Sequence, residues 1–222
     1  MSKLEEMISE LCPDGVEFKY FSDVAEYIRG ITYGKSDESE NGIPVLRANN
    51  ITIGQNVLNF DDVKHVKTTV KIKPNQFLKK DDILICAGSG SKDHIGKVAY
   101  IFDDMEFAFG GFMAVVREKN PSELLPRYMF HNLTSSDFRD YIRSTIESST
   151  INNLNLKVIS DFKIPVPPIK IQTEIVRILD SLSDSIDELV LLLEKELTLR
   201  KKQYEYYRDQ LLTFSEIKKE SR

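Results

Sequence analysis

The 222-residue chain has two cysteines, three histidines and no tryptophan. Cys12 and Cys86 are too few and too far apart in sequence for a disulfide framework, and the three histidines lack the close spacing of a zinc site. No run approaches the roughly 18 apolar residues of a membrane span, and no apolar signal core follows the polar start Met1–Glu6. These absences predict a soluble, cytoplasmic protein in a reducing compartment, with no metal and no membrane contact.

Two segments resemble catalytic motifs and depart from them. Gly88–Lys97 resembles a phosphate-binding loop, but five residues lie between Gly90 and Gly96 where the motif has four, and Val98 stands where a hydroxyl would bind magnesium. Val166–Ile169 contains a Pro-Pro pair without the Asp or Asn and the aromatic residue of amino-methyltransferases. The sequence therefore predicts that this chain is not an enzyme.

Charge is distributed unevenly along the chain. Residues 1–62 contain 5 Lys+Arg against 12 Asp+Glu, whereas residues 63–100 contain 8 against 3. Two interpretations of the basic stretch stay open. Its lysines are typical of a solvated sheet edge that resists aggregation, and they are equally typical of a surface that faces phosphates on an otherwise acidic protein.

The apolar pattern of the first 168 residues predicts an α+β domain with a mixed sheet of many short strands. A short helix is expected over 2–11, helical structure over 124–146, and one more strand before the proline segment Ile164–Pro168. The expected strands are Ile43–Arg47, Ile51–Ile53, Thr69–Ile72, Ile83–Cys86, Val98–Phe102 and Phe112–Arg117.

Beyond the prolines, one amphipathic helix is predicted over 169–214, followed by a polar tail over 215–222. Its apolar positions recur at steps of three and four, with Arg200 at one expected apolar place. These positions are Ile171, Ile175, Ile178, Leu182, Ile186, Leu189, Leu193, Leu197, Tyr204, Tyr207 and Leu211. At 1.5 Å per residue the helix is about 65 Å long, so its apolar face needs a partner. The steps average nearer 3.6 than 3.5 residues, which indicates a nearly straight rod.

An ordered set of short segments resembles the DNA-specificity subunit of type I restriction-modification systems. No single segment is specific for the family, but the ordered set is. The segment Ile171–Glu174 departs from the family pattern, because it keeps Gln172 and lacks the Glu that usually precedes it. The segments are Val16–Lys19, Phe21–Val24, Gly30–Lys35, Gly42–Arg47, Asp82–Ile85, Ile95–Ala99, Ser149–Asn155 and Ile164–Pro168.

The resemblance implies a target recognition domain (1–168) followed by a spacer helix, a unit that full-length family members carry twice. It implies a half-subunit that forms a homodimer through antiparallel helices and reads an interrupted palindromic site in double-stranded DNA. Chemistry would belong to partners: a methylation subunit that binds S-adenosylmethionine, and a motor-nuclease subunit that uses ATP and Mg. Two alternatives stay open: a truncated docking or regulatory protein that does not read DNA, and the recognition end of a longer methyltransferase-nuclease chain.

Candidate DNA contacts are Lys and Arg side chains for phosphates and polar side chains for base edges, all placed in loops. Arg47 and its neighbours follow a strand, although an Asn pair is also an ordinary turn. Small residues in Gly88–His94 would let backbone approach DNA closely, whereas Ser149–Asn155 is also suited to capping. The candidates are Tyr33, Lys35, Arg47, Asn49, Asn50, Lys64, Lys67, Ser89, Ser91, Lys92, His94, Thr150 and Asn152.

Overall fold

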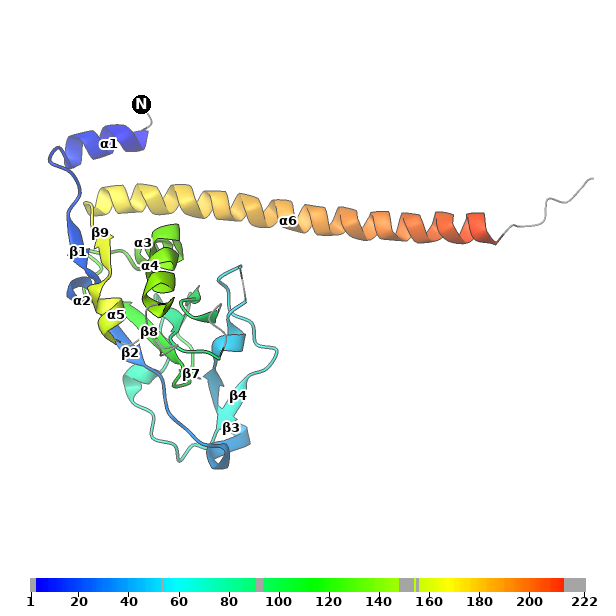
Figure 1. The fold of residues 1–222 in the computed structure, drawn as a ribbon, viewed down its shortest axis with the longest axis horizontal. Helices are drawn as coiled ribbons and strands as arrows, with labels where there is room; N and C mark the ends of the chain where they lie inside the picture. The colour runs from blue at the N-terminus through cyan, green and yellow to red at the C-terminus, as the bar shows by residue number, and fades with distance from the viewer. Residues whose placement is uncertain (1–2, 53, 91–93, 148–153, 155, 214–222) are drawn as a thin grey trace, which may run out of the picture. The chain divides into compact units, whose positions relative to one another are not determined.

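The computed structural model describes residues 3–52, 54–90, 94–147, 154 and 156–213. The chain divides into two compact units, Met1–Val176 and Arg177–Arg222. Each unit is described by itself. The first is the globular unit and the second is the greater part of one helix, which Figure 1 draws as a single uninterrupted ribbon.

A four-stranded antiparallel sheet forms the centre of the globular unit. Its order is β2 (Ala25–Arg29), β8 (Met113–Glu118), β5 (Ile83–Cys86) and β6 (Val98–Tyr100). Successive side chains of a strand point to opposite faces, and in β5 they enter two different cores: Ile83 and Ile85 enter the first, Leu84 and Cys86 the second. Because both faces are buried, the strand is apolar throughout, as its sequence predicts.

Helices cover the first face of this sheet. The apolar residues of α2 (Phe21–Val24), α3 (Pro126–Thr134), α4 (Ser136–Glu147) and α5 (Leu156–Asp161) enter the first core. Phe138 of α4 is 1% exposed and packs edge-to-face on Phe162, with ring centroids 5.0 Å apart. The four helices therefore fix this face and leave the loops at the strand ends to form surface.

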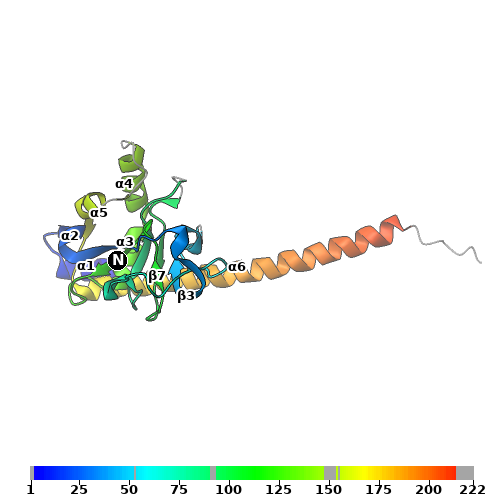
Figure 2. The same ribbon diagram turned by 90° about the horizontal axis from the view of Figure 1, so that it is seen from below.

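A three-stranded sheet lies beyond the second core, with the order β4 (Lys64–Val66), β3 (Glu38–Leu46) and β7 (Ala108–Phe109). The β3–β7 pair is parallel and the β3–β4 pair antiparallel, which makes the sheet mixed, as predicted. Both views place β3 and β7 on the side of the unit away from α2 and α5 (Figures 1 and 2). Three 3₁₀ turns, η1 (Lys35–Asp37), η2 (Ala48–Asn50) and η3 (Pro74–Gln76), connect these elements.

The two ends of the globular unit meet in a small antiparallel pair, β1 (Phe18–Tyr20) with β9 (Lys163–Pro165). Helix α1 (Lys3–Leu11) precedes this pair, and α6 (Ile169–Leu212) follows it. Gln172 is fully buried in the first turn of α6: its Oε1 accepts the Leu125 N–H at 2.9 Å, and its Nε2 donates to the carbonyls of Glu123 and Pro167. The Gln of the proline-helix segment is thus the residue that fastens the start of α6.

The predicted apolar stripe of α6 divides at about Val176. Ile171 is 1% exposed and Ile175 packs on the first core, so these two residues belong to the globular unit and are removed from the predicted pairing surface. From Leu182 to Leu211 the stripe is 55–71% exposed. Among the described residues, no helix is long and apolar enough to span a membrane.

The predicted helix 2–11 and the strand Ile83–Cys86 are confirmed, while several other elements differ. Thr69–Ile72 is not a strand: Val70 donates to the Lys67 carbonyl in a turn and, with Ile72, packs on a small core. Ile51 forms only an isolated bridge to Leu58. The helical region 124–146 is two helices, α3 and α4, and the elements β1, β2, β4, β7, α2 and α5 were not predicted.

Candidate nucleic-acid interface

Three residues, Gly110, Gly111 and Phe112, form a corner between β7 and β8 at which several chain segments converge. A Cβ at Gly30, the residue that follows β2, would collide with the Gly110 carbonyl oxygen, so only a glycine fits where the chain passes the corner. The Gly110 N–H donates to the Leu46 carbonyl at 2.9 Å, which ties the corner to the end of β3. Phe112 is 70% exposed. We name these three residues the glycine corner.

The loop after β5 is fastened to the same corner. The N–H groups of Ala87 and Gly88 both donate to the Phe112 carbonyl, at 2.8 and 2.9 Å, and Leu154 donates to the Ala87 carbonyl at 2.6 Å. Segments that the sequence separates by more than a hundred residues therefore share one edge of the globular unit. Parts of three predicted DNA-contacting segments, those that contain Tyr33, Arg47 and Ser89, lie at or next to this corner.

Arg47 and Asn49 stand beside one another on the turn that follows β3. The Asp62 carboxylate accepts from Arg47 Nη2 at 2.7 Å and from Asn49 Nδ2 at 3.2 Å. The Arg47 side chain is 32% exposed, and its Nε is buried without a hydrogen-bond partner. One carboxylate thus orients a guanidinium and an amide together, the two groups best suited to read guanine and adenine edges.

Asn50 has a different role. It is fully buried, its Oδ1 accepts the Arg47 N–H at 2.9 Å, and its Nδ2 donates to the carbonyls of Asn59 and Asp62. The side chain closes the loop that carries Arg47 and Asn49. Because these groups are already used, we withdraw Asn50 as a base contact and assign it a positioning role.

Tyr33 interacts electrostatically with Arg47 and Lys64, two side chains that are predicted to contact DNA. Burial raises the pKa of its hydroxyl most, while the charges of Arg47 and Lys64 lower it and that of Glu38 raises it. The Lys64 ammonium is 3.1 Å from Glu38 Oε2, and Lys67 Nζ donates to the Ser36 carbonyl at 2.7 Å. Lys64 stands on β4, an edge strand, so the sheet-edge interpretation of its charge agrees with its position.

The partly buried Lys97 anchors the end of the loop that follows β5. Lys97 Nζ donates to the carbonyls of Ala48 and Ile51, at 3.3 and 3.0 Å, and burial lowers the pKa of its ammonium. This contact joins the loop to the Arg47 turn. Ser89 and His94 are half-buried on the loop, and Lys35 is exposed at η1. Four predicted contacts lie outside the described residues: Ser91, Lys92, Thr150 and Asn152.

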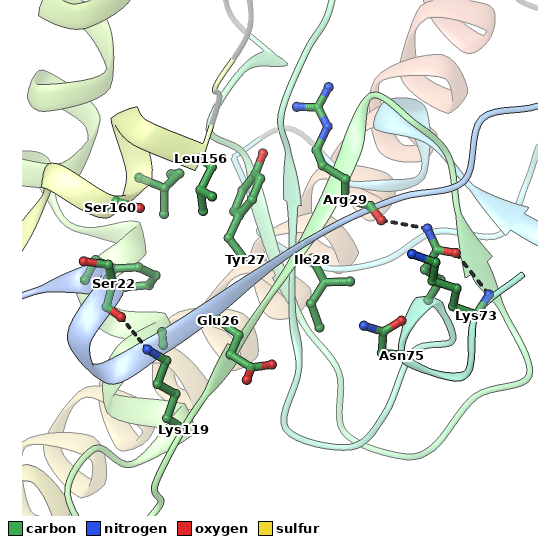
Figure 3. A pocket seen from close by; sticks show the side chains of 14 residues that line it. Ser22, Glu26, Tyr27, Ile28, Arg29, Lys73, Asn75, Lys119, Leu156 and Ser160 are labelled. Carbon is green, nitrogen blue, oxygen red and sulfur yellow. Dashed lines mark hydrogen bonds between the residues drawn. The ribbon is translucent and has the colours of Figure 1, made fainter.

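A cavity of about 610 Å³ lies along β2, between α2 and α5 on one side and η3 on the other. Figure 3 shows its basic residues Arg29, Lys73 and Lys119, with the acidic Glu26. Lys119 Nζ donates to the Ser22 carbonyl at 2.6 Å, and both Arg29 and Tyr27 donate to the Leu154 carbonyl. These side chains fasten neighbouring segments, so we assign the cavity no ligand.

Sequence reasoning missed the glycine corner, Phe112 and Asp62. The signal for the corner was present as the Gly-Gly pair before a strand, but the partners that make it a junction are distant in sequence. Among the described residues no group of three or more His, Cys, Asp or Glu is placed to hold a metal ion.

The chain thus combines a small α+β unit with converging loops and a long amphipathic helix that is exposed over most of its length. Residues 13–198 match the family model described as type I restriction modification DNA specificity domain. The chain therefore belongs to the type I restriction-modification DNA specificity family.

Related sequences and structures agree with this assignment. The chain is 33% identical over 182 residues to the EcoKI specificity subunit of Escherichia coli K12, covering 79% of this chain and 38% of that protein. It is 32% identical over 190 residues to the StySPI specificity subunit of Salmonella potsdam, covering 82% and 39%. The chain thus spans well under half the length of these relatives.

Two solved structures share the fold. One is a chain from a structure on complex assembly and conformational transition of the type I R-M system, with TM-score 0.60 and 17% identity over 95% of this chain and 50% of that chain. The other is the HsdS subunit from Thermoanaerobacter tengcongensis, with TM-score 0.57 and 17% identity over 84% and 44%.

Proposed function

We propose that the chain is the DNA-reading half of a specificity subunit, and that two copies pair through α6 to read an interrupted palindrome. The observation that supports the proposal is that Arg47 and Asn49 share the Asp62 carboxylate on a turn that Leu46, the residue before it, ties to the glycine corner with its exposed Phe112. A two-fold pair of identical readers requires a site with matching two-fold symmetry. On this proposal the chain performs no chemistry and positions methylation subunits on DNA.

Partner subunits would supply the cofactors, S-adenosylmethionine for methylation and ATP with Mg for the motor-nuclease. The direct test of function is to map methylated adenines in cells with and without the gene. Loss of one interrupted palindromic motif on deletion supports the proposal. Loss of an asymmetric motif, or no change where a methylation subunit is active, contradicts it.

A second function, docking without DNA reading, is favoured by a separate observation. Leu191, Leu199 and Tyr206 are 51%, 61% and 61% exposed, and at about 100° per residue they lie away from the main stripe of α6. They offer a surface to another subunit. Purified chain mixed with its methylation subunit and random DNA distinguishes the two functions, because docking alone produces no methylated motif of its own.

Arg47 provides the sharpest test of base reading. Arg47→Ala is expected to weaken binding to the target by roughly 10–100-fold, as loss of a bidentate base contact costs about 1–3 kcal/mol. Arg47→Lys should be nearly as damaging, because a lysine keeps the charge but not the fork. Titration by fluorescence anisotropy with specific and scrambled duplexes measures both effects.

Lys170→Ala is the control for this series, since it removes one positive charge from an exposed side chain in the first turn of α6. Two results together would show that Arg47 contacts phosphate and not a base: Arg47→Lys binds the target as tightly as the unmodified protein, and Arg47→Ala loses the same factor in affinity for the scrambled duplex as for the target.

Phe112 is expected to contact a base face or a thymine methyl group. Phe112→Ala should weaken DNA binding by about 10-fold, within the range of one base–aromatic contact. Its 70% exposure predicts that folding is hardly affected. Phe18→Ala, at a 61% exposed phenylalanine on β1, is the matched control. Equal binding by both variants in the same titration would remove Phe112 from the interface.

A further inference from the structure

The stripe of α6 that lies outside the globular unit has a symmetric spacing; its first residue, Ile178, is half-buried in the single chain, and its apolar residues from Leu182 to Leu211 are exposed. In an antiparallel two-fold pair, the numbers of two facing residues add up to a constant. From Ile178 to Leu211 the ten stripe positions, with Arg200 included, form five kinds of layer, each occurring twice in the pair, whose residue numbers add up to 389 or 390. The layers are Ile178 with Leu211, Leu182 with Tyr207, Ile186 with Tyr204, Leu189 with Arg200, and Leu193 with Leu197, the second residue coming from the second copy.

The sequence alone permits a rival pairing one heptad away. There the numbers add up to 382 or 383, and Ile171 faces Leu211 while Ile175 faces Tyr207. The fold decides between them. Ile171 is 1% exposed and Ile175 packs on the first core, so neither is available to a second copy. The pairing that begins at Ile178 uses every stripe position outside the globular unit.

Charge selects the direction of pairing. Between Ile178 and Glu194 the helix carries five acidic residues and no basic one, whereas Lys195–Leu211 carries five basic and three acidic residues. A parallel pair would place the acidic halves side by side. An antiparallel pair places each acidic half against the more basic half of the second copy, which is the favourable arrangement.

We propose, as a deepening of the function proposed above, that two copies pair antiparallel in this register, with the two-fold axis between Glu194 and Lys195. Val176 of each copy then lies about 28 Å from the axis, so the two Val176 residues are about 56 Å apart along the rod. Arg200 faces Leu189 in this register and Leu182 in the rival one. The stripe therefore specifies one separation between two DNA-reading units.

Cysteine cross-linking of the full-length chain tests the register. All variants carry Cys12→Ser, and Cys86 is fully buried. The double variant Ile186→Cys with Tyr204→Cys is expected to convert most of the protein to a covalent dimer under mild oxidation, because facing positions meet the distance requirement of a disulfide. The matched variant Ile178→Cys with Tyr204→Cys reports the rival register and should stay largely uncoupled.

Leu189→Cys alone reports a parallel pair, since in the proposed register the two copies of residue 189 are about 17 Å apart. The proposed register is wrong if Leu189→Cys forms a covalent dimer. It is also wrong if the Ile178/Tyr204 double variant cross-links and the Ile186/Tyr204 double variant does not. Either result leaves the homodimer itself intact. Light scattering on the unmodified chain separates the two proposals: a dimer that no variant couples overturns the register alone, and a monomer at micromolar concentration removes the homodimer as well.

Discussion

Leu193→Glu is expected to convert the dimer into monomers, with a dissociation constant raised by at least about 100-fold. In the proposed register this leucine lies one layer from the two-fold axis and meets Leu197 of the second copy. The substitution therefore acts twice per dimer, and each buried leucine contributes about 1.5–3 kcal/mol. Two carboxylates near the axis add a desolvation cost. Sedimentation over a concentration series measures the shift.

The same helix offers a matched control in Leu191→Glu. Leu191 is 51% exposed and Leu193 is 59% exposed in the single chain, so helix propensity and solvation change almost equally. Leu191 lies away from the stripe, and its variant should remain a dimer. If both variants dissociate alike, the stripe is not the contact surface, whatever the oligomeric state of the unmodified chain.

Loss of pairing should also appear in DNA binding. A dimer holds its second reader near the second half-site at high effective concentration, and a monomer lacks this advantage. Leu193→Glu is therefore expected to bind a full interrupted site no better than a half-site, while Leu191→Glu keeps the preference for the full site. Two titrations with equal-length duplexes make the comparison.

The elements that the sequence predicted well are those whose burial pattern is local. Helix α6 is marked by its period and by the prolines before it, and β5 by four consecutive apolar residues. The failures share a physical cause. Val70 and Ile72 are partly buried, as their character predicts, but a turn at Lys67 satisfies the Val70 N–H and no ladder forms. An apolar pattern predicts which side chains are buried. It does not predict whether a segment pairs as a strand, because the hydrogen-bond partners come from distant parts of the chain.

The interface was predicted in the same uneven way. Arg47 and Asn49 follow an apolar strand, so their place at a strand end was readable from the sequence. Their shared contact with Asp62 was not readable, because it depends on how a 15-residue connection closes. The glycine corner depends on the backbone at Gly30 meeting Gly110, a residue 80 positions later. Ile171 entered the predicted pairing surface because helical period alone cannot tell a core face from a face for a second copy.

Asp82→Asn is expected to lower the free energy of unfolding by about 3–5 kcal/mol. Asp82 Oδ1 and Oδ2 accept from Arg117 Nε and Nη2 at 2.6 and 2.8 Å, and Oδ2 also accepts the Lys79 N–H. The Asp82 side chain is 0% exposed and that of Arg117 only 20%. Removing one partner leaves a largely buried charge uncompensated, which is the costly way to break such a pair.

Replacing both partners distinguishes this charge effect from simple misfolding. Asp82→Leu combined with Arg117→Met leaves no unpaired ion, so the double variant should be more stable than Asp82→Asn, with only the Lys79 N–H losing its acceptor. Asp140→Asn is the surface control: its pair with Arg143 is 3.6 Å long with both side chains at least 70% exposed, and its loss should cost under about 1 kcal/mol. Urea unfolding midpoints at constant slope compare the three variants.

Equal losses for Asp82→Asn and Asp140→Asn would mean that the bidentate pair does not hold β5 against β8. Because β5 leads into Ala87 and β8 begins beside Phe112, a loosened pair should also reduce DNA affinity in Asp82→Asn and spare it in Asp140→Asn.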